Sequence, residues 1–386
     1  MDRPPSSAAH RALRHFRGYA PATPVRSVYL RSWVVAALCA AARCLTAVAT
    51  FARSAAQVTA NVYVVHVAGP DGVIVANSDG VLATSDAGAH WRNITPRTMS
   101  PVLFGHIVDI ESFGTTRIWL ELVGDERMDF IPYTDNGGAT WRLGVLPGGA
   151  ALSGTAPTLS FWTPESGLAV GERNGGAIGL YQTDDGGASW KQVAGATAGP
   201  FGGPVTFTSA SDGWTWNGGG SMYRTDDGGR TWRQVRPPTL RGYKLTAVEQ
   251  PEFFGGDVVI VIARLRTAGG ATRTAFFESR DGGASWHSQL APRAADATTT
   301  AAFAASGSDW FALTGSELLA TASAGRTWQE SGVRTPTGLS INTIDYLSQT
   351  IGWAEAAGPA IGDLYPTYLL RTTDGGRTWL KVDYQP

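Results

Sequence analysis

Cysteine is almost absent from this chain of 386 residues. The two cysteines, Cys39 and Cys44, both lie in one apolar stretch near the N-terminus, and neither directly follows a small residue, as a lipoprotein site would require. The rest of the chain therefore has no disulfide, no cysteine nucleophile and no cysteine ligand for a metal.

Charge is also scarce, and it is unevenly spread. Charged residues make up 16% of the chain, and residues 1–56 hold eight of the 31 basic side chains but one of the 32 acidic ones. The remainder carries a net charge of −8. Such a mildly acidic domain has no broad basic field to attract phosphates, so we expect no binding to nucleic acid.

Long helical patterns are missing as well. The 48 glycines and 21 prolines are scattered throughout, and no helical periodicity persists after residue 60. This composition favours an all-β protein with many turns.

The N-terminal region predicts export. Residues 1–32 are basic, with Asp2 the one acid, and we expect them to be disordered. Trp33–Ala52 is apolar apart from Arg43, and small residues follow, which is typical of a secretory signal. The alternatives are a retained membrane anchor, for which Arg43 would be costly, and an organellar transit peptide. As signal or anchor, residues 1–56 place the rest outside the cytoplasm, with residues 33–52 as the membrane tether if they are retained.

One eight-residue pattern, Ser/Thr-x-Asp-x-Gly-x-x-Trp, occurs seven times, and in two of the copies Asn or Ser replaces the Asp. We call it the turn motif. Its third residues are Asp86, Asn136, Asp185, Asp227, Asp281, Ser323 and Asp374. Its final residues are Trp91, Trp141, Trp190, Trp232, Trp286, Trp328 and Trp379.

The spacing of these motifs predicts a propeller. The tryptophans lie 50, 49, 42, 54, 42 and 51 residues apart, as expected for blades or solenoid units. Residues 57–386 leave about 47 residues per repeat, which suits a four-stranded blade. We therefore predict seven four-stranded antiparallel blades at about 57–95, 104–145, 156–195, 203–237, 243–290, 299–332 and 340–384.

The residue types of the motif suit a tight turn between two strands. Glycine tolerates positive φ, and the Asp carboxylate accepts backbone hydrogen bonds of its own turn. The tryptophan is expected to pack against the next blade. A calcium site would need six to eight oxygen ligands, and no copy has more than two carboxylates, so we predict no metal and no cofactor.

A second pattern lies upstream of most motifs and indicates the two inner strands of each blade. The aromatic residues Trp119, Trp214, Trp310 and Trp353 fall at matching places, with Leu168 as the substitute in the third blade. Chain order gives the first and last blades four strands each. The ring should therefore close by face-to-face packing of blade one on blade seven. A swapped strand at the closure is the alternative.

The motif copies resemble Asp-boxes, also called bacterial neuraminidase repeats, over about residues 61–382. Such repeats occur in sialidases, sortilin-type receptors, xyloglucanases and photosystem II assembly and stability factors. The chain is most similar to the last family, with one ring, a leader and blades ending in Asp-Gly-Gly-x-Thr-Trp. This resemblance implies an exported, monomeric, non-enzymatic module that binds a membrane protein or its exported segment.

Insertions supply the candidate binding residues, because repeated positions build the ring. Blade five carries a set of basic and aromatic side chains for an acidic partner segment: Arg241, Tyr243, Lys244, Arg264, Arg266 and Arg273. The alternative is a group of solvated loop charges.

A glycoside hydrolase is the alternative function. Asp109 and Glu111 alternate with apolar neighbours and so share one strand face, which could line the central channel together with Glu121. The Arg-Ile-Pro or Arg-Leu-Pro element usual in sialidases is missing from the sequence.

Overall fold

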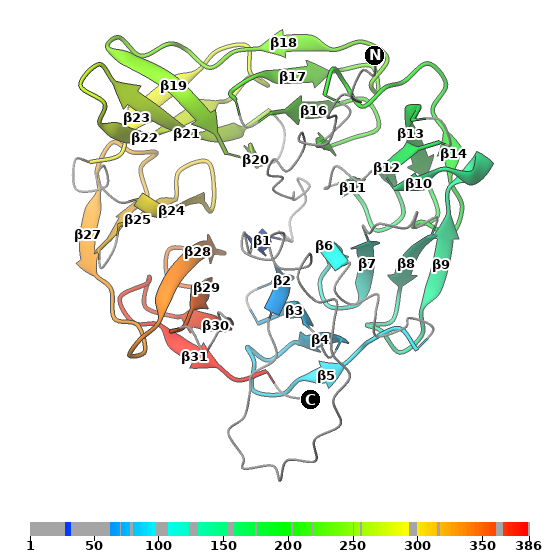
Figure 1. The fold of residues 1–386 in the computed structure, drawn as a ribbon, viewed down its shortest axis with the longest axis horizontal. Coiled ribbons are helices and arrows are strands. Elements are labelled where there is room, and N and C mark those ends of the chain that lie inside the picture. Colours follow the sequence, from blue (N-terminus) through cyan, green and yellow to red (C-terminus); the bar gives the residue numbers. More distant parts are fainter. Residues whose placement is uncertain are drawn as a thin grey trace, which may run out of the picture.

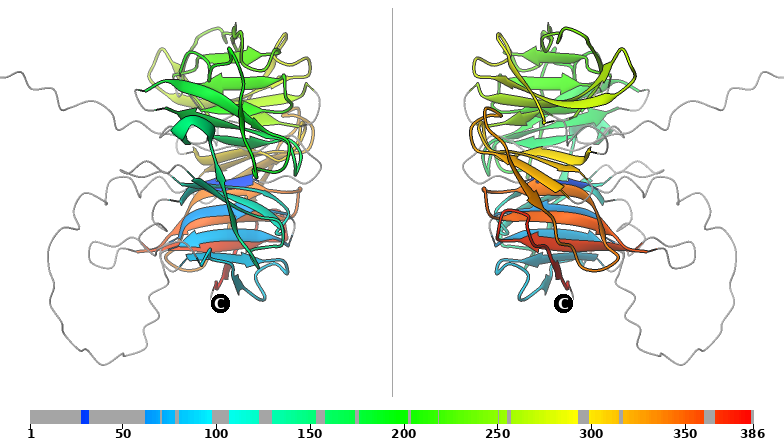
Figure 2. Two further views of the ribbon diagram at one scale, coloured as in Figure 1. Left: turned by 90° about the vertical axis from the view of Figure 1, so that its right-hand side faces the viewer. Right: turned by 90° about the vertical axis from the view of Figure 1, so that its left-hand side faces the viewer.

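The predicted fold, a seven-bladed β-propeller of four-stranded antiparallel blades, is confirmed (Figure 1). The computed structural model describes residues 28–31, 62–69, 71–77, 80–97, 107–122, 130–152, 158–173, 176–201, 204–217, 219–249, 251–254, 257–292, 299–314, 317–359 and 366–384. Within these residues the helical structure is one 3-10 turn at Pro147–Gly149. Seen from the side, the strands run roughly along the short axis of the ring (Figure 2).

The strands of each blade follow one another in the chain. Blade one comprises β2 (Val62–Val67), β3 (Val73–Asn77), β4 (Gly80–Thr84) and β5 (Arg92–Asn93). Blade two comprises β6 (Ile107–Phe113), β7 (Arg117–Leu122), β8 (Phe130–Thr134) and β9 (Arg142–Val145). Blade three comprises β10 (Ala151–Leu152), β11 (Leu159–Phe161), β12 (Gly167–Glu172), β13 (Ile178–Thr183) and β14 (Lys191–Gln192). The short strand β10 pairs beside β11 on β12.

Blades four to seven continue the same order. They comprise β15 (Val205–Phe207), β16 (Gly213–Trp216), β17 (Met222–Thr225) and β18 (Arg233–Val235); β19 (Tyr243–Val248), β20 (Glu252–Phe253), β21 (Val259–Thr267), β22 (Thr272–Ser279) and β23 (His287–Leu290); β24 (Thr299–Ala304), β25 (Trp310–Thr314), β26 (Glu317–Thr321) and β27 (Gln329–Gly332); and β28 (Ser340–Tyr346), β29 (Gly352–Ala357), β30 (Thr367–Thr372) and β31 (Leu380–Val382). In blade five both β19 and β20 pair with β21.

A fifth strand extends blade one on its inner side. β1 (Val28–Arg31) pairs antiparallel with β2, from Val28 opposite Val67 to Arg31 opposite Val64. These four residues belong to the leader that is expected to be disordered, and their backbone adds a strand at the inner edge of β2. The predicted signal or anchor segment, residues 33–52, lies outside the described residues.

The turn motif folds the same way in all seven blades. The hydroxyl of its first residue donates to the third residue, as Thr225 does to Asp227 Oδ1 at 2.8 Å. That Oδ1 also accepts the backbone N–H of Thr231 at 2.8 Å, and the N–H of Gly229 donates to the Thr225 hydroxyl at 2.9 Å. These bonds hold the motif as a tight turn between two strands.

The motif tryptophans pack against the preceding blade, so the prediction that they face the next blade is wrong. Trp141 Nε1 donates to the Ile94 carbonyl at 2.7 Å, and Trp232 Nε1 donates to the Thr197 carbonyl at 3.1 Å. Both carbonyls belong to the segment that leaves the preceding blade. The hydrogen bonds to them hold each indole on the side of its own blade that faces the preceding one.

The inner aromatic pattern holds for four of its five positions. Trp119, Leu168, Trp214 and Trp353 each pair with the residue just before a turn motif. Trp310 instead pairs with Thr321, the first motif residue, so it lies one register position away. The prediction of matching places is therefore wrong for Trp310, since a one-residue shift turns a strand side chain to the other face.

The ring closes by packing of blade seven on blade one. All four strands of blade seven come from one continuous segment, and the described sheets share no strand across this seam. A buried cluster bridges it, with Trp353, Leu369 and Tyr384 lying against Val65 and Val75. This arrangement agrees with the predicted face-to-face closure.

Candidate functional site

The three carboxylates of the glycosidase hypothesis are buried in blade two. Asp109 and Glu121 are direct partners across β6 and β7, and Glu111 is opposite Trp119. Each side chain has no more than 4% of its surface exposed. The structure thus brings Asp109 and Glu121 together, next to a bulge in β6.

Glu121 links blade two to blade three. Both of its carboxylate oxygens lie 2.9 Å from the backbone nitrogen of Thr158, and Oε1 also accepts the Thr158 hydroxyl at 2.9 Å. Burial raises the pKa of Glu121 to about 7, although the hydrogen bonds from Thr158 oppose that rise. A raised pKa alone would suit a general acid, but these bonds also give the side chain a structural task at the blade interface.

Other buried polar side chains connect inner strands in the same manner. His66 Nε2 lies 2.8 Å from Ser112 Oγ of the next blade, and burial lowers the pKa of His66 to about 3. Ser160 Oγ lies 3.3 Å from Thr206 Oγ1 between blades three and four. Polar residues near the ring centre therefore fix the relative positions of neighbouring blades.

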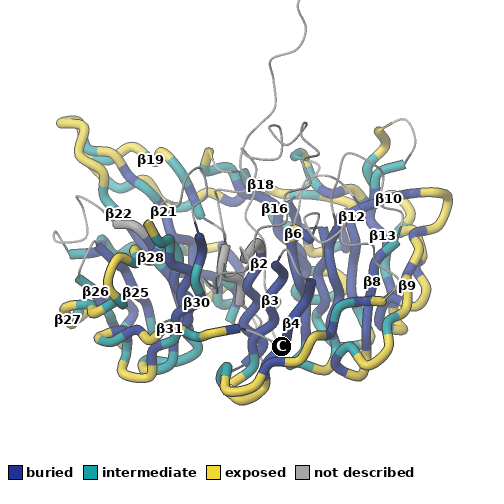
Figure 3. The backbone as a smooth tube through the Cα atoms, turned by 60° about the horizontal axis from the view of Figure 1, so that its bottom comes forward, coloured by how far each residue is buried: buried dark blue, intermediate teal, exposed yellow. Residues whose placement is uncertain are grey.

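The basic residues of blade five lie on its longest hairpin, formed by β21 and β22, and on the neighbouring segment that enters β19. β21 has nine residues and β22 has eight, and the region of β19 extends beyond the buried strands (Figure 3). Lys244 of β19 is directly opposite Arg266 of β21, and both are exposed. Arg264 lies two residues along the same strand, so all three side chains occupy one face. We call Lys244, Arg264 and Arg266 the basic face.

The charges on this face are not equally compensated. Arg264 Nη2 lies 3.3 Å from Glu249 Oε1, with 24% and 13% of the two side chains exposed. Arg266 Nε donates to the Gly270 carbonyl at 3.3 Å, which leaves its charge without a carboxylate partner in the described residues. Like charges directly opposite each other on a sheet are destabilising. Lys244 and Arg266 therefore favour an anionic group placed between or above them.

The other predicted residues of blade five lie elsewhere. Arg273 is opposite Leu265 on the other face of the sheet, and its Nη2 donates to the Ala291 carbonyl at 3.0 Å. Tyr243 packs against the core shared with blade four. Arg241 is exposed in the turn before β19. The structure therefore brings together three of the six predicted residues.

Sequence reasoning missed Glu249, which compensates Arg264. The bulge between Leu245 and Ala247 shifts the register, so alternation along β19 could not have placed this side chain. No triplet of His, Cys, Asp or Glu in the described ranges is arranged to hold a metal ion. Among the same residues no helix is long and apolar enough to cross a membrane.

Comparison with solved structures identifies the fold. YCF48 from Cyanidioschyzon merolae superposes with a TM-score of 0.50 at 14% identity, over 82% of this chain and 95% of that chain. This chain shares the fold of YCF48. A YCF48 structure described as bound to D1 peptide gives a TM-score of 0.40 at 17% identity, over 72% of this chain and 80% of that chain.

An enzyme also appears among the structural neighbours. The GH74 xyloglucanase from Xanthomonas campestris gives a TM-score of 0.31 at 14% identity, over 84% of this chain and 64% of that chain. No family model matches the chain, and no curated protein matches it. At these identities the likeness to YCF48 supports the propeller fold alone, and function has to be argued from the residues.

Proposed function

We propose that this protein is an exported, non-enzymatic propeller that binds an acidic segment of a partner protein through the basic face of blade five. The observation that carries the proposal is the cross-strand pair of Lys244 and Arg266, two exposed like charges held opposite each other. An acidic segment on this face would compensate both charges, and the nearby Thr272 adds a hydroxyl donor on the same face.

The wider assembly role is part of the same proposal. The peptide named for the second YCF48 structure belongs to that protein and contributes only the idea that such a ring can hold a partner segment. For this chain the partner would be a membrane protein or its exported segment. Export through residues 1–56, a tether at residues 33–52 and the monomeric state stay predictions.

The test uses a fluorescein-labelled peptide of alternating Glu and Val as the probe, with a Gln-and-Val peptide as the neutral control. The full chain should bind the acidic peptide, and binding should weaken as salt rises. The double variant K244Q/R266Q should lose about tenfold or more in affinity, since each charge-assisted hydrogen bond is worth about 1.5–3 kcal/mol.

A matched variant controls for net charge. Lys191 and Arg233 are exposed on the outer strands β14 and β18. The double variant K191Q/R233Q removes the same two charges and should leave the affinity unchanged. Equal losses in the two double variants would show that the peptide follows overall charge and would overturn the proposal. Hydrolysis of a sialyl or glucan substrate that is lost in Glu111→Gln or Glu121→Gln would support the glycosidase alternative instead.

A further inference from the structure

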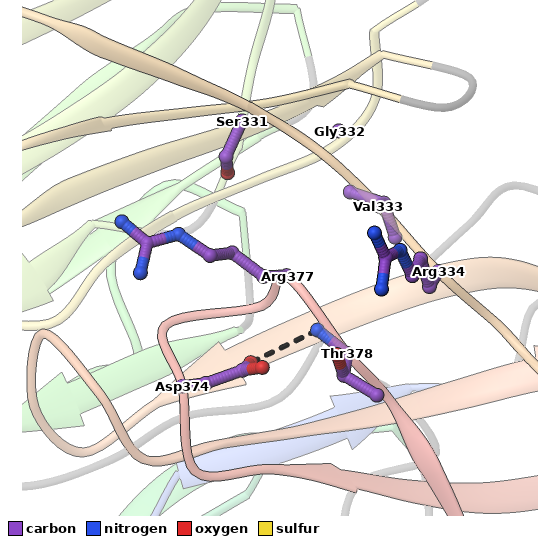
Figure 4. A pocket seen from close by; sticks show the side chains of 7 residues that line it. All are labelled: Ser331, Gly332, Val333, Arg334, Asp374, Arg377 and Thr378. Atoms are coloured by element: carbon purple, nitrogen blue, oxygen red, sulfur yellow. Dashed lines mark hydrogen bonds between the residues drawn. The ribbon is translucent and has the colours of Figure 1, made fainter.

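A pocket of about 650 Å³ lies between the outer strand of blade six and the turn motif of blade seven. It is lined by Ser331, Gly332, Val333 and Arg334 from one side and by Asp374, Arg377 and Thr378 from the other (Figure 4). A volume of this size suits a small-molecule ligand.

The two arginines of this pocket are held in place through their backbones. The N–H of Arg334 donates to the Arg377 carbonyl at 2.8 Å, and the N–H of Trp379 donates to the Arg334 carbonyl at 2.9 Å. Arg334 and Thr378 form a parallel bridge. These bonds tie two blades together and fix the spacing between two basic residues that are far apart in the sequence.

The side chains of Arg334 and Arg377 remain exposed, and in the described part of the chain neither forms an ion pair with a carboxylate. In Figure 4 the two guanidinium groups point to different ends of the pocket. Asp374, the one acid in the lining, is directed at its own turn, where its Oδ1 accepts the N–H of Thr378 at 2.9 Å and the hydroxyl of Thr372 at 2.9 Å.

The chain offers an internal comparison for Arg377. Arg230 occupies the same sixth position of the turn motif in blade four, but its Nη1 donates to the carbonyl of Asp227 in its own turn at 2.6 Å. Arg377 makes no such bond to its own turn and extends into the pocket. Beside Arg377, the backbone N–H of Arg334 donates to the Arg377 carbonyl, and the segment of Arg334 forms the other wall of the pocket.

We propose that this pocket binds a small elongated dianion, with one oxyanion group held by Arg334 and the other by Arg377. Planar guanidinium groups bind carboxylate and phosphate oxygens with two parallel hydrogen bonds, and the main-chain bonds between Arg334 and Arg377 limit the separation of the two groups and so the length of the ligand. The hydroxyl of Ser331 and the apolar side chain of Val333 complete the lining. The site is separate from the basic face and does not depend on the function proposed for it.

The experiment is a calorimetric titration of the full chain at low salt with malonate, succinate, glutarate and adipate, with inorganic phosphate, and with neutral succinamide. We expect saturable binding of one dicarboxylate length with a dissociation constant of about 1 mM or tighter, weaker binding of the other lengths, and none of succinamide. Arg334→Gln and Arg377→Gln should each weaken the preferred ligand about tenfold.

Further outcomes separate this proposal from general attraction of anions. Arg230→Gln should leave affinity unchanged, because that guanidinium is directed at its own turn. Tightest binding of inorganic phosphate, with no dependence on dicarboxylate length, would mean that one arginine suffices and would overturn the two-ended site. No saturation by any of these anions, or an equal loss in Arg230→Gln, would overturn it as well. Circular dichroism of each variant checks that the ring is intact.

Discussion

Arg371 Nη2 lies 3.2 Å from Asp71 Oδ1, and this ion pair joins the last blade to the first across 300 positions of sequence. The Arg371 guanidinium also lies over the ring of Trp353, 5.5 Å from its centroid. Arg224 makes the equivalent contacts between blades four and five, with the Trp214 ring and with Asp257. The closing interface therefore repeats the contacts of an interior one.

Asp71→Asn should destabilise the ring only slightly. The carboxylate is 61% exposed, and exposed ion pairs contribute about 0–1 kcal/mol to the free energy of unfolding. The loss should vanish at about 1 M salt, where surface charges are screened. Asp257→Asn is the control and should cost less, because Arg224 keeps a second partner in Asp212 at 3.0 Å. Urea unfolding at two salt concentrations measures both; a loss above about 3 kcal/mol in Asp71→Asn would contradict this account.

Glu121→Gln should change how stability depends on pH. The pKa of Glu121 is raised from 4.5 to about 7 in the folded protein, first by burial. The contribution of protonated Glu121 to the free energy of unfolding is therefore fully present below pH 4.5 and is lost as the pH rises through 7. A glutamine keeps an acceptor for Thr158 but does not ionise. Between pH 5 and 8 the wild type should lose roughly 3 kcal/mol more than the variant. If the free energies of unfolding of the two proteins changed with pH in parallel, the result would be inconsistent with a buried Glu121 of raised pKa.

Gly229→Ala should be among the most damaging changes in the turn motif. Gly229 has a φ of +84°, and a Cβ there would lie 2.6 Å from Leu180 Cδ1 and 2.9 Å from the Thr197 carbonyl oxygen. We expect a loss of about 2 kcal/mol or more. Ala324→Gly is the matched change at the preceding motif position, where Ala324 has a φ of 52°. It should alter stability by less than about 1 kcal/mol. Thermal melts of the two variants test this ranking.

Motif tryptophans should differ in importance according to burial. Trp379 is 2% exposed, whereas Trp232 is half-buried. Trp379→Ala should cost about 3–5 kcal/mol and Trp232→Ala roughly 2 kcal/mol. Sequence alone gave both residues the same place in the repeat and could not separate them. Equal losses in urea unfolding would argue against burial as the cause.

Asp227→Asn should be mild at neutral pH. In blade two Asn136 already forms the same turn, because its Oδ1 accepts the N–H of Thr140 and its Nδ2 donates to the Thr140 hydroxyl at 2.8 Å. Hydrogen bonds, first from the Thr231 hydroxyl, lower the pKa of Asp227 from 3.8 to about 2. Stability from this group is therefore present above pH 3.8 and lost as the pH falls through 2. As the pH is lowered from 5 to 2, the melting temperature should fall less steeply for the variant than for the wild type.

The repeat was enough to predict the ring, because seven tryptophans at a near-constant spacing leave few other folds. The sequence did not reveal the side of the blade to which each indole points, since that depends on carbonyls such as those of Ile94 and Thr197. Trp310 was misplaced by one residue for a similar reason. A shift of one position in β25 keeps the apolar composition and changes only the register.

The candidate sites were less predictable than the fold. The basic residues of blade five were visible as an insertion, but the division into two faces depends on strand register, which a bulge alters. Arg377 stands out as a motif residue, whereas Arg334 belongs to no motif. Their proximity arises from main-chain bonds between two blades, and one-dimensional spacing does not record such bonds.

The closure of the ring with no strand shared between the described sheets of blades one and seven has a consequence for the engineering of this fold. Each blade is a complete unit of consecutive strands, and Tyr384 at the end of the last unit already packs on the first. Apart from the added strands β1, β10 and β20, every blade has the same four consecutive strands. Chain ends moved to another linker, such as residues 236–242, would cut the circle at an equivalent place, and a circular permutant should rebuild the same ring.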